Sequence, residues 1–252
     1  MWQQTMAAAA LVALFVWAVP AGVMASSGSG DVIDHAPFGE VLDEYVDDGN
    51  VDYAGLYDDE DARETLEEYV RQIGEANARG HTRQAVMAFL INAYNALVIA
   101  DVIERWPVET VMDEEGFFDG THHRVARANM TLDQLDKTYI RKRYSDPRVN
   151  YVLVCAAKSC PPLRSDPLTE RTIERVLDEA RAAYLASAVQ LTDEGHVETS
   201  QLFKWYNEEF EQASGSVRDY LAEHIDDERI SQALQQGAQV VFREYDWSLN
   251  SP

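Results

Sequence analysis

Hydrophobic side chains recur at helical spacing through much of the chain, and the longest such stretch runs from residue 82 to 106. Its middle, AFLINAYNALVIADVI, is apolar on nearly every side, which is typical of a helix buried in a protein core. Thr82 is a suitable N-terminal cap, and Pro107 disfavours helical geometry in the residue before it. The pattern therefore predicts a central helix over 82–106.

Shorter amphipathic stretches predict further helices, and strands are few. Helices are expected over 38–46, 60–78, 131–144 and 169–187, with several short ones through 201–235. Strands are expected over 122–126, before a turn at Ala128-Asn129, over 149–155 as a buried strand, over 189–191 and 196–198 as a hairpin, and over 239–245. The expected fold is α+β: a single, mostly helical domain with a few short, mainly antiparallel strands.

The N-terminus has the pattern of an export signal. The first 25 residues carry no charged side chain, and an apolar run ends at Pro20 before small residues. Cleavage after Ala25 would leave a flexible leader, 26–34, and one domain, 35–252, with no integral membrane segment. The alternative is a retained anchor, because residues 6–25 approach the roughly 20 apolar residues that span a bilayer. We expect a periplasmic or secreted protein.

Acidic residues outnumber basic ones by 44 to 21, which gives a formal charge of −23. Nucleic-acid binding and docking on anionic lipid are therefore not expected, since both require clustered basic surface. A peptide or small-molecule ligand of neutral or cationic character fits this charge better. The acidity is ordinary solvated surface charge or an adaptation to high salt, in which case added salt should raise stability.

The segment Cys155-Ala-Ala-Lys-Ser-Cys160 is the strongest candidate for chemistry, because it follows a predicted buried strand and precedes two prolines. Cys160 could be a nucleophilic thiolate, with Lys158 nearby to favour the charged form. The two cysteines could instead form a disulfide, which requires the chain to fold back until their Cα atoms are roughly 6 Å apart. A third alternative is two buried free thiols that only pack.

Asn92 and Asn95 lie about 60° apart around the central helix and share a face, whereas Asp101 lies about 180° from Asn92. Buried amides need hydrogen-bond partners. The two asparagines therefore bond neighbouring backbone or orient a base in a pocket.

His122 and His123 are the candidate bases, and in an extended segment their side chains point to opposite faces. One histidine with Cys155 and Cys160 would supply three zinc ligands, but the spacing matches no standard zinc pattern. No metal or cofactor is predicted. The aromatic groups Trp205-Tyr206 and Tyr245-Asp246-Trp247 either pack against the core or form a platform for a sugar or peptide.

Five segments in order resemble the domain of unknown function 547 family, in its bacterial, exported form. They are VDYAGL at 51–56, AFLINAYNALVI at 88–99, LVCAAKSCPPLR at 153–164, LFKWYNEEF at 202–210 and YDWSLN at 245–250. The resemblance implies a fold but no reaction. Two positions depart from the family pattern, in which a histidine often stands where this chain has Asn150 and another where it has Lys137.

Two functions remain open from the sequence. The first is a thiol-dependent hydrolase or acyl transferase, with Cys160 as nucleophile, His123 or His122 as base, and Asn92 or Asn95 as the orienting group. The second is a non-catalytic binding or scaffolding module of the cell envelope, in which a disulfide between Cys155 and Cys160 fixes a loop.

Overall fold

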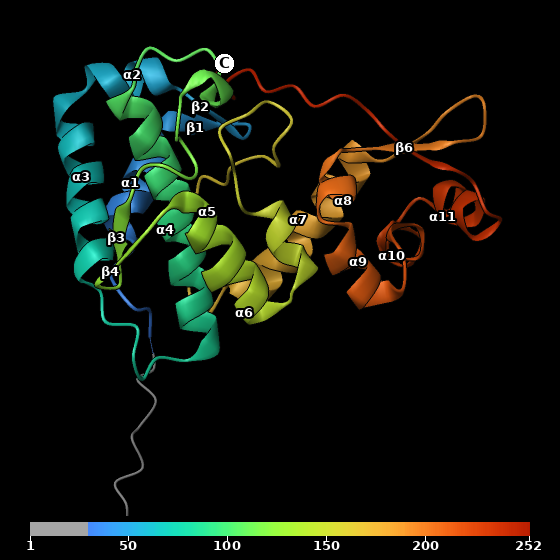
Figure 1. Ribbon diagram of the computed structural model, residues 1–252, viewed down its shortest axis with the longest axis horizontal. Coiled ribbons are helices and arrows are strands. Elements are labelled where there is room, and N and C mark those ends of the chain that lie inside the picture. The colour runs from blue at the N-terminus through green and yellow to red at the C-terminus, as the bar shows by residue number, and fades with distance from the viewer. Residues whose placement is uncertain (1–29) are drawn as a thin grey trace, which may run out of the picture.

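The computed structural model describes residues 30–252, and the predicted mostly helical α+β architecture is confirmed (Figure 1). The predicted signal peptide, residues 1–25, lies outside the described residues. The α-helices are α1 Ala36–Tyr45, α2 Tyr53–Asp58, α3 Glu60–Glu75, α4 Arg83–Glu104, α5 Leu132–Gln134, α6 Lys142–Tyr144, α7 Ile173–Ala188, α8 Leu202–Trp205, α9 Asn207–Ser214, α10 Val217–His224 and α11 Glu228–Gln235. A π-helix, η2 Leu135–Arg141, joins α5 to α6, and 3₁₀ turns form η1 Val111–Asp113 and η3 Pro147–Tyr151.

The strands are short and form three small sheets. They are β1 Val46–Asp47, β2 Asn50–Val51, β3 His123–Val125, β4 Ala128–Met130, β5 Gln190–Leu191, β6 Val197–Thr199 and β7 Val240–Phe242. Strands β1 and β2, β3 and β4, and β5 and β6 pair antiparallel, as expected. The closing strand β7 instead pairs parallel to β6, because the helices α8 to α11 lie between them in the chain.

Helix α4 is the centre of the larger hydrophobic core. Thr82 caps it by accepting a hydrogen bond from the backbone N–H of Ala85, and helices α2, α3 and α7 pack around it (Figure 1). In the described part of the chain, α4 is long and apolar enough to cross a membrane, but 89% of its most apolar window is buried inside the protein. It is therefore placed as a core helix.

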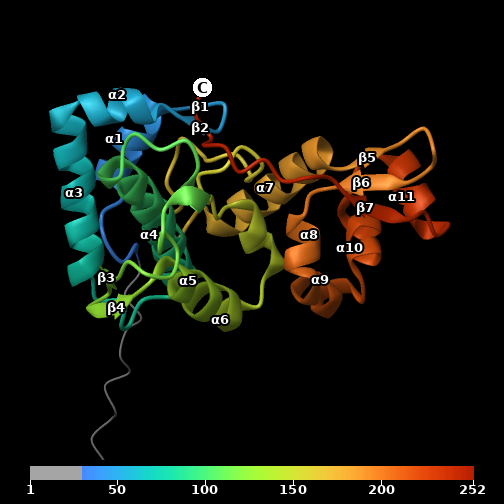
Figure 2. The same cartoon turned by 45° about the horizontal axis from the view of Figure 1, so that its top comes forward.

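A second, smaller core lies at the far end of α7. It gathers large side chains from the end of α7, from α8 to α11 and from the β5–β6–β7 sheet, including Tyr184, Phe203, Phe210 and Tyr220. From β7 the chain returns across the molecule and ends beside β1 and β2 (Figure 2). Asn250 secures that end, since its carbonyl accepts from Val51 N–H and its side chain accepts from the Tyr53 hydroxyl.

Two local predictions were wrong. Residues 149–155 do not form a strand: Asp146 caps a 3₁₀ turn whose first residue is Pro147, and the following segment pairs with a side chain of α4. The turn of the β3–β4 hairpin lies at Ala126 and Arg127, not at Ala128-Asn129, and both of these residues have positive φ.

The described end of the predicted leader is held in place. Glu170 accepts a hydrogen bond from the backbone N–H of Gly30, and its own N–H donates to Asp31. Val32 and Ile33 pack against the larger core.

Candidate functional site

Cys155 and Cys160 form a disulfide, so this is the alternative that the structure contains. The chain folds back between them until their Cα atoms are 6.2 Å apart, with the N–H of Cys160 donating to Ala157. The hydroxyl of Tyr245 lies 3.4 Å from Sγ of Cys155 and 3.3 Å from Sγ of Cys160. The C-terminal segment thus closes over the disulfide.

The disulfide forms part of the wall of a cavity of about 170 Å³ between the two cores. The lining side chains come from α4, the loop before β3, α5, η2, η3, the cysteine loop, α8 and the C-terminal segment. They include Tyr94, Phe118, Asp133, Asp136, Lys137, Arg141, Asn150, Leu153, Cys155, Cys160, Pro161, Leu202, Trp205, Tyr206, Tyr245 and Trp247. We call this space the disulfide cavity.

One wall of the disulfide cavity is aromatic. The rings of Trp205, Tyr245 and Trp247 contact one another, with centroids 4.7 Å apart for Trp205 and Tyr245 and 5.6 Å apart for the two tryptophans. Trp205 remains 47% exposed although it lies within this cluster. The two tryptophans stack while Tyr245 is tilted against both, and the exposed Trp205 offers an apolar ring to a ligand.

Another part of the lining is polar, and most of it comes from the π-helix η2. Asp136 and Arg141 are five residues apart, which in an α-helix would place them about 140° apart. The wider π turn brings them together, with Nε of Arg141 2.6 Å from Oδ1 of Asp136. π-Helical turns are rare and occur often at functional sites.

Arg141 is the centre of a buried polar network. Its Nη1 donates to Asn150 at 2.7 Å and to Glu209 at 3.1 Å, and its guanidinium lies over the Tyr206 ring. The side chains of Arg141 and Asp136 are each only 9% exposed. Burial raises the pKa of Asp136 above its ordinary value, and the adjacent guanidinium opposes that rise.

Two hydroxyls remain available in this cavity. Oη of Tyr94 and Oη of Tyr206 make no hydrogen bond to other described residues, and both residues line the cavity. Burial raises the pKa of both phenols, so they keep their protons and can donate. The cavity therefore combines an aromatic wall with convergent donors and acceptors.

The predicted site residues Asn92 and Asn95 act as structural braces. The amide of Asn92 bonds both the carbonyl and the N–H of Leu168, at 2.7 and 2.9 Å. The amide of Asn95 donates to the carbonyl of Val152 and accepts from Val154 N–H. The space beside the two asparagines is about 10 Å³, no larger than one water requires.

The two histidines lie elsewhere. His123 points inward, with Nε2 3.1 Å from Oδ2 of the buried Asp101. His122 is exposed, and its ring lies within hydrogen-bond distance of the carbonyl of Gly120. Their opposite orientation was predicted. Both line a cavity of about 630 Å³ on the α3 side of α4, whose described lining residues include no serine or cysteine.

The structure therefore does not bring the sequence-predicted site residues together. Cys160, the histidines and the asparagines line three separate spaces that share no residue.

The match to known families covers the central part of this architecture. The family described as "Protein of unknown function, DUF547" matches residues 78–185. In this segment the chain resembles the DUF547 family. The segment runs from the turn before α4 through η2 and the disulfide to most of α7. No curated protein and no solved structure matches the chain.

The DUF547 segment contains most of the disulfide cavity, and its aromatic wall comes from residues after the segment. Lys137 and Asn150, the two positions where the sequence was expected to depart from the family pattern, both line the cavity. Asp136, Arg141 and Tyr94 were not predicted as site residues. Asp136 and Arg141 lie among several other charged residues in the predicted helix 131–144, and their spacing placed them on different faces of an α-helix, so nothing in the sequence singled them out.

Proposed function

We propose that the protein is an exported binding module that acts with its disulfide closed and holds a single-ring, neutral polar ligand, such as one sugar unit, in the disulfide cavity. The proposal rests on one observation. The aromatic cluster around Trp205 and the polar network around Arg141 line the same cavity.

The size and charge of the cavity support this ligand class. At about 170 Å³ the cavity is smaller than the roughly 300–1,000 Å³ of sites for drug-sized ligands, which favours one ring. Its charges are largely paired, because Lys137 bonds Asp133, and Arg141 bonds Asp136 and Glu209. A neutral polyol would stack its C–H face on the tryptophans and exchange hydrogen bonds with the hydroxyls of Tyr94 and Tyr206.

A thiol-dependent hydrolase or acyl transferase is the rival proposal. It requires reduction of the disulfide to free the Cys160 thiol, and it requires a base other than His122 or His123, which line a different cavity. The binding proposal needs neither change, so we prefer it.

Tryptophan fluorescence tests the binding proposal directly. After signal cleavage the predicted chain has three tryptophans, and Trp106 lies outside the cavity. A Trp106→Phe variant therefore reports only on Trp205 and Trp247. We expect one or more members of a panel of neutral monosaccharides and N-acetylated amino sugars to change its emission saturably.

Two aromatic substitutions make the test specific. Trp205→Ala should weaken binding at least tenfold with little loss of stability, because the ring is 47% exposed. Tyr57→Ala, an aromatic that is 42% exposed and lies on another cavity, should leave affinity unchanged. No saturable binding at millimolar concentrations, or binding that survives Trp205→Ala, would refute the proposal. Ester or thioester hydrolysis that appears only after reduction and is lost in Cys160→Ala would favour the rival.

A further inference from the structure

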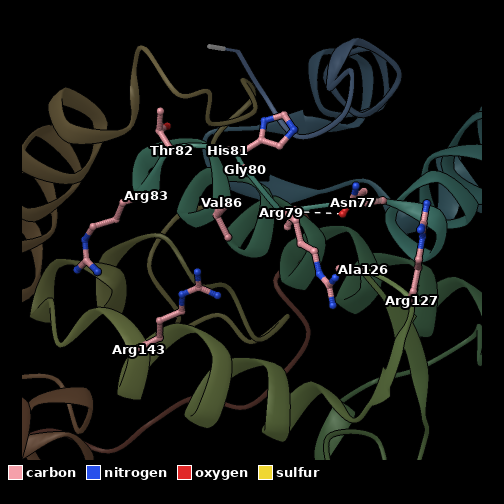
Figure 3. Close-up of a pocket in the computed structure, with 12 residues that line it drawn as sticks. Asn77, Arg79, Gly80, His81, Thr82, Arg83, Val86, Ala126, Arg127 and Arg143 are labelled. Carbon is pink, nitrogen blue, oxygen red and sulfur yellow. Dashed lines mark hydrogen bonds between the residues drawn. The ribbon is translucent and has the colours of Figure 1, made fainter. Parts of the chain in front are cut away.

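A second cavity, separate from the disulfide cavity, gathers positive charge on an otherwise acidic protein (Figure 3). It has a volume of about 990 Å³ and lies where the α3–α4 loop meets the β3–β4 turn and α6. Four arginines line it, Arg79, Arg83, Arg127 and Arg143, together with His81. No acidic residue is among its described lining residues. We call it the arginine cavity.

The charges of these arginines are not neutralised within the described chain. All four side chains are exposed, and none forms an ion pair with a described carboxylate, although the protein has 44 acidic residues. Arg83 donates to the carbonyl of Tyr144, and Arg127 donates to that of Glu75, so the acceptors are neutral backbone groups. Such a concentration of like charge is unfavourable unless an anion compensates it.

The four arginines are spread along the cavity, with Arg79 and Arg143 nearest its middle (Figure 3). Arg79 extends from the α3–α4 loop toward Ala126, and Arg143 extends from the helix beneath toward Val86. Arg83 and Arg127 lie at the two ends, where they donate to the carbonyls of Tyr144 and Glu75. The guanidinium groups come from three segments that are distant in sequence.

The backbone N–H groups at the start of α4 also favour an anion. The cavity includes the start of the 22-residue helix α4, where the N–H groups of the first turn have no partner within the helix. Thr82 satisfies the N–H of Ala85, which leaves those of Arg83 and Gln84. These groups and the helix dipole favour negative charge at this end.

We propose that the arginine cavity binds a multiply charged phosphoryl group. A phosphoryl group presents three oxygens and up to two charges to several guanidinium groups at once, whereas a carboxylate can satisfy only one or two of them. One carboxylate lies at the edge of the cavity, since Glu170 accepts a hydrogen bond from the Thr82 hydroxyl at 2.6 Å. The four arginines outnumber it, and the charge of the more distant acidic surface is screened over about 8 Å at physiological ionic strength. This site is independent of the proposed function of the disulfide cavity.

The phosphoryl group could belong to a soluble phosphorylated molecule or to a lipid headgroup. The arginine cavity borders the start of the described chain, since a ring nitrogen of His81 lies 3.1 Å from the carbonyl oxygen of Gly30. The net charge of −23 predicts no general docking on anionic lipid, so a headgroup would be bound only through this basic cavity.

Calorimetry and vesicle sedimentation at about 0.15 M salt test the proposal on the chain that begins at residue 26. The probes are pyrophosphate, vesicles of phosphatidylglycerol with phosphatidylcholine, and vesicles of phosphatidylcholine alone. The test variant combines Arg79→Ser and Arg143→Ser, neither of which removes a side-chain hydrogen bond within the described chain. The control is Arg175→Ser, an exposed arginine paired with Glu179 on α7.

We expect the wild type and the control to bind pyrophosphate or the anionic vesicles, and the double variant to bind at least tenfold more weakly at an unchanged melting temperature. Binding of pyrophosphate indicates a soluble ligand, and binding of only the anionic vesicles indicates a headgroup. The proposal is overturned if neither probe binds the wild type, or if the double variant binds as well as the control.

Discussion

The guanidinium carbon of Arg141 lies 3.6 Å from the centre of the Tyr206 ring, and this contact joins the polar network to the aromatic side of the disulfide cavity. The same guanidinium neutralises Asp136, whose side chain is 9% exposed. Arg141 therefore stabilises the fold as well as shaping the cavity.

Arg141→Met should lower the free energy of unfolding at pH 7 by about 3–5 kcal/mol, because it leaves the buried carboxylate of Asp136 without a countercharge. Without Arg141 the pKa of Asp136 should rise further, so the folded state should hold its proton at higher pH than the unfolded chain. The destabilisation should therefore shrink as the pH falls toward 5. Urea unfolding at several pH values measures both effects.

Arg175→Met is the matched control for this substitution, since Arg175 forms an exposed pair with Glu179. It should cost no more than about 1 kcal/mol. A loss in Arg141→Met that is equally small, or that grows on acidification, would mean that Asp136 is not held by this pair.

Asn95→Ala should destabilise the protein, because Asn95 has a structural role and no role in ligand binding. It removes the partner of the Val152 carbonyl and of the Val154 N–H, and each buried group left unpaired costs about 1–3 kcal/mol. Asn207→Ala, whose amide bonds Glu211 on the surface of α9, should change stability little. If thermal unfolding shows Asn95→Ala to be as stable as Asn207→Ala, the brace does not exist.

These braces show how far the sequence could predict the structure. The angular spacing on one helix predicted that Asn92 and Asn95 share a face. The need of buried amides for hydrogen bonds predicted that they bond neighbouring backbone or orient a base. The predicted strand at 149–155 was wrong because β-branched residues also suit an extended segment whose partner is a side chain. In this structure the amide of Asn95 replaces the neighbouring strand.

The two cavities could not be predicted by the same reasoning. Asp136 and Arg141 share a face only because η2 is a π-helix, and no local signal in the sequence indicates that geometry. Arg127 and Arg143 join Arg79 only through tertiary packing. In contrast, a disulfide between Cys155 and Cys160 was one of three alternatives that the sequence predicted, because the spacing allows the chain to fold back between them.

His35 should make stability depend on pH. Its side chain is 4% exposed, its Nδ1 lies 2.6 Å from the Tyr69 hydroxyl, and its Nε2 is sealed without a partner. Burial lowers the pKa of His35 below its ordinary value near 6.5, against the opposing effect of Asp31 and Asp34. Below pH 6.5 the unfolded chain therefore binds a proton that the folded protein excludes, and stability falls with the pH.

His35→Gln keeps a polar partner for Tyr69 but does not titrate. The free energy of unfolding should fall between pH 7 and pH 5 by more in the wild type than in His35→Gln. Parallel pH profiles for the two proteins would show that the pKa of His35 is the same in the folded and unfolded states, which contradicts the prediction.

The cysteines should behave as a structural pair. Cys155→Ser and Cys160→Ser should each lower the free energy of unfolding by about 2 kcal/mol, the loop-entropy value for so short a loop, and the double substitution should cost little more than either single one. Chemical unfolding of the three variants measures this. If Cys160→Ser lowers the free energy of unfolding and Cys155→Ser does not, Cys160 has a role separate from the disulfide.

The most direct test of the central claim, that the cavity acts in its disulfide-bonded form, is the intact mass of the mature protein after alkylation with and without prior reduction. The protein should be purified from an oxidising compartment and alkylated under denaturing conditions. We predict no added label before reduction and two labels after it, at Cys155 and Cys160. Two labels without reduction would contradict the account and return Cys160 to consideration as a nucleophile.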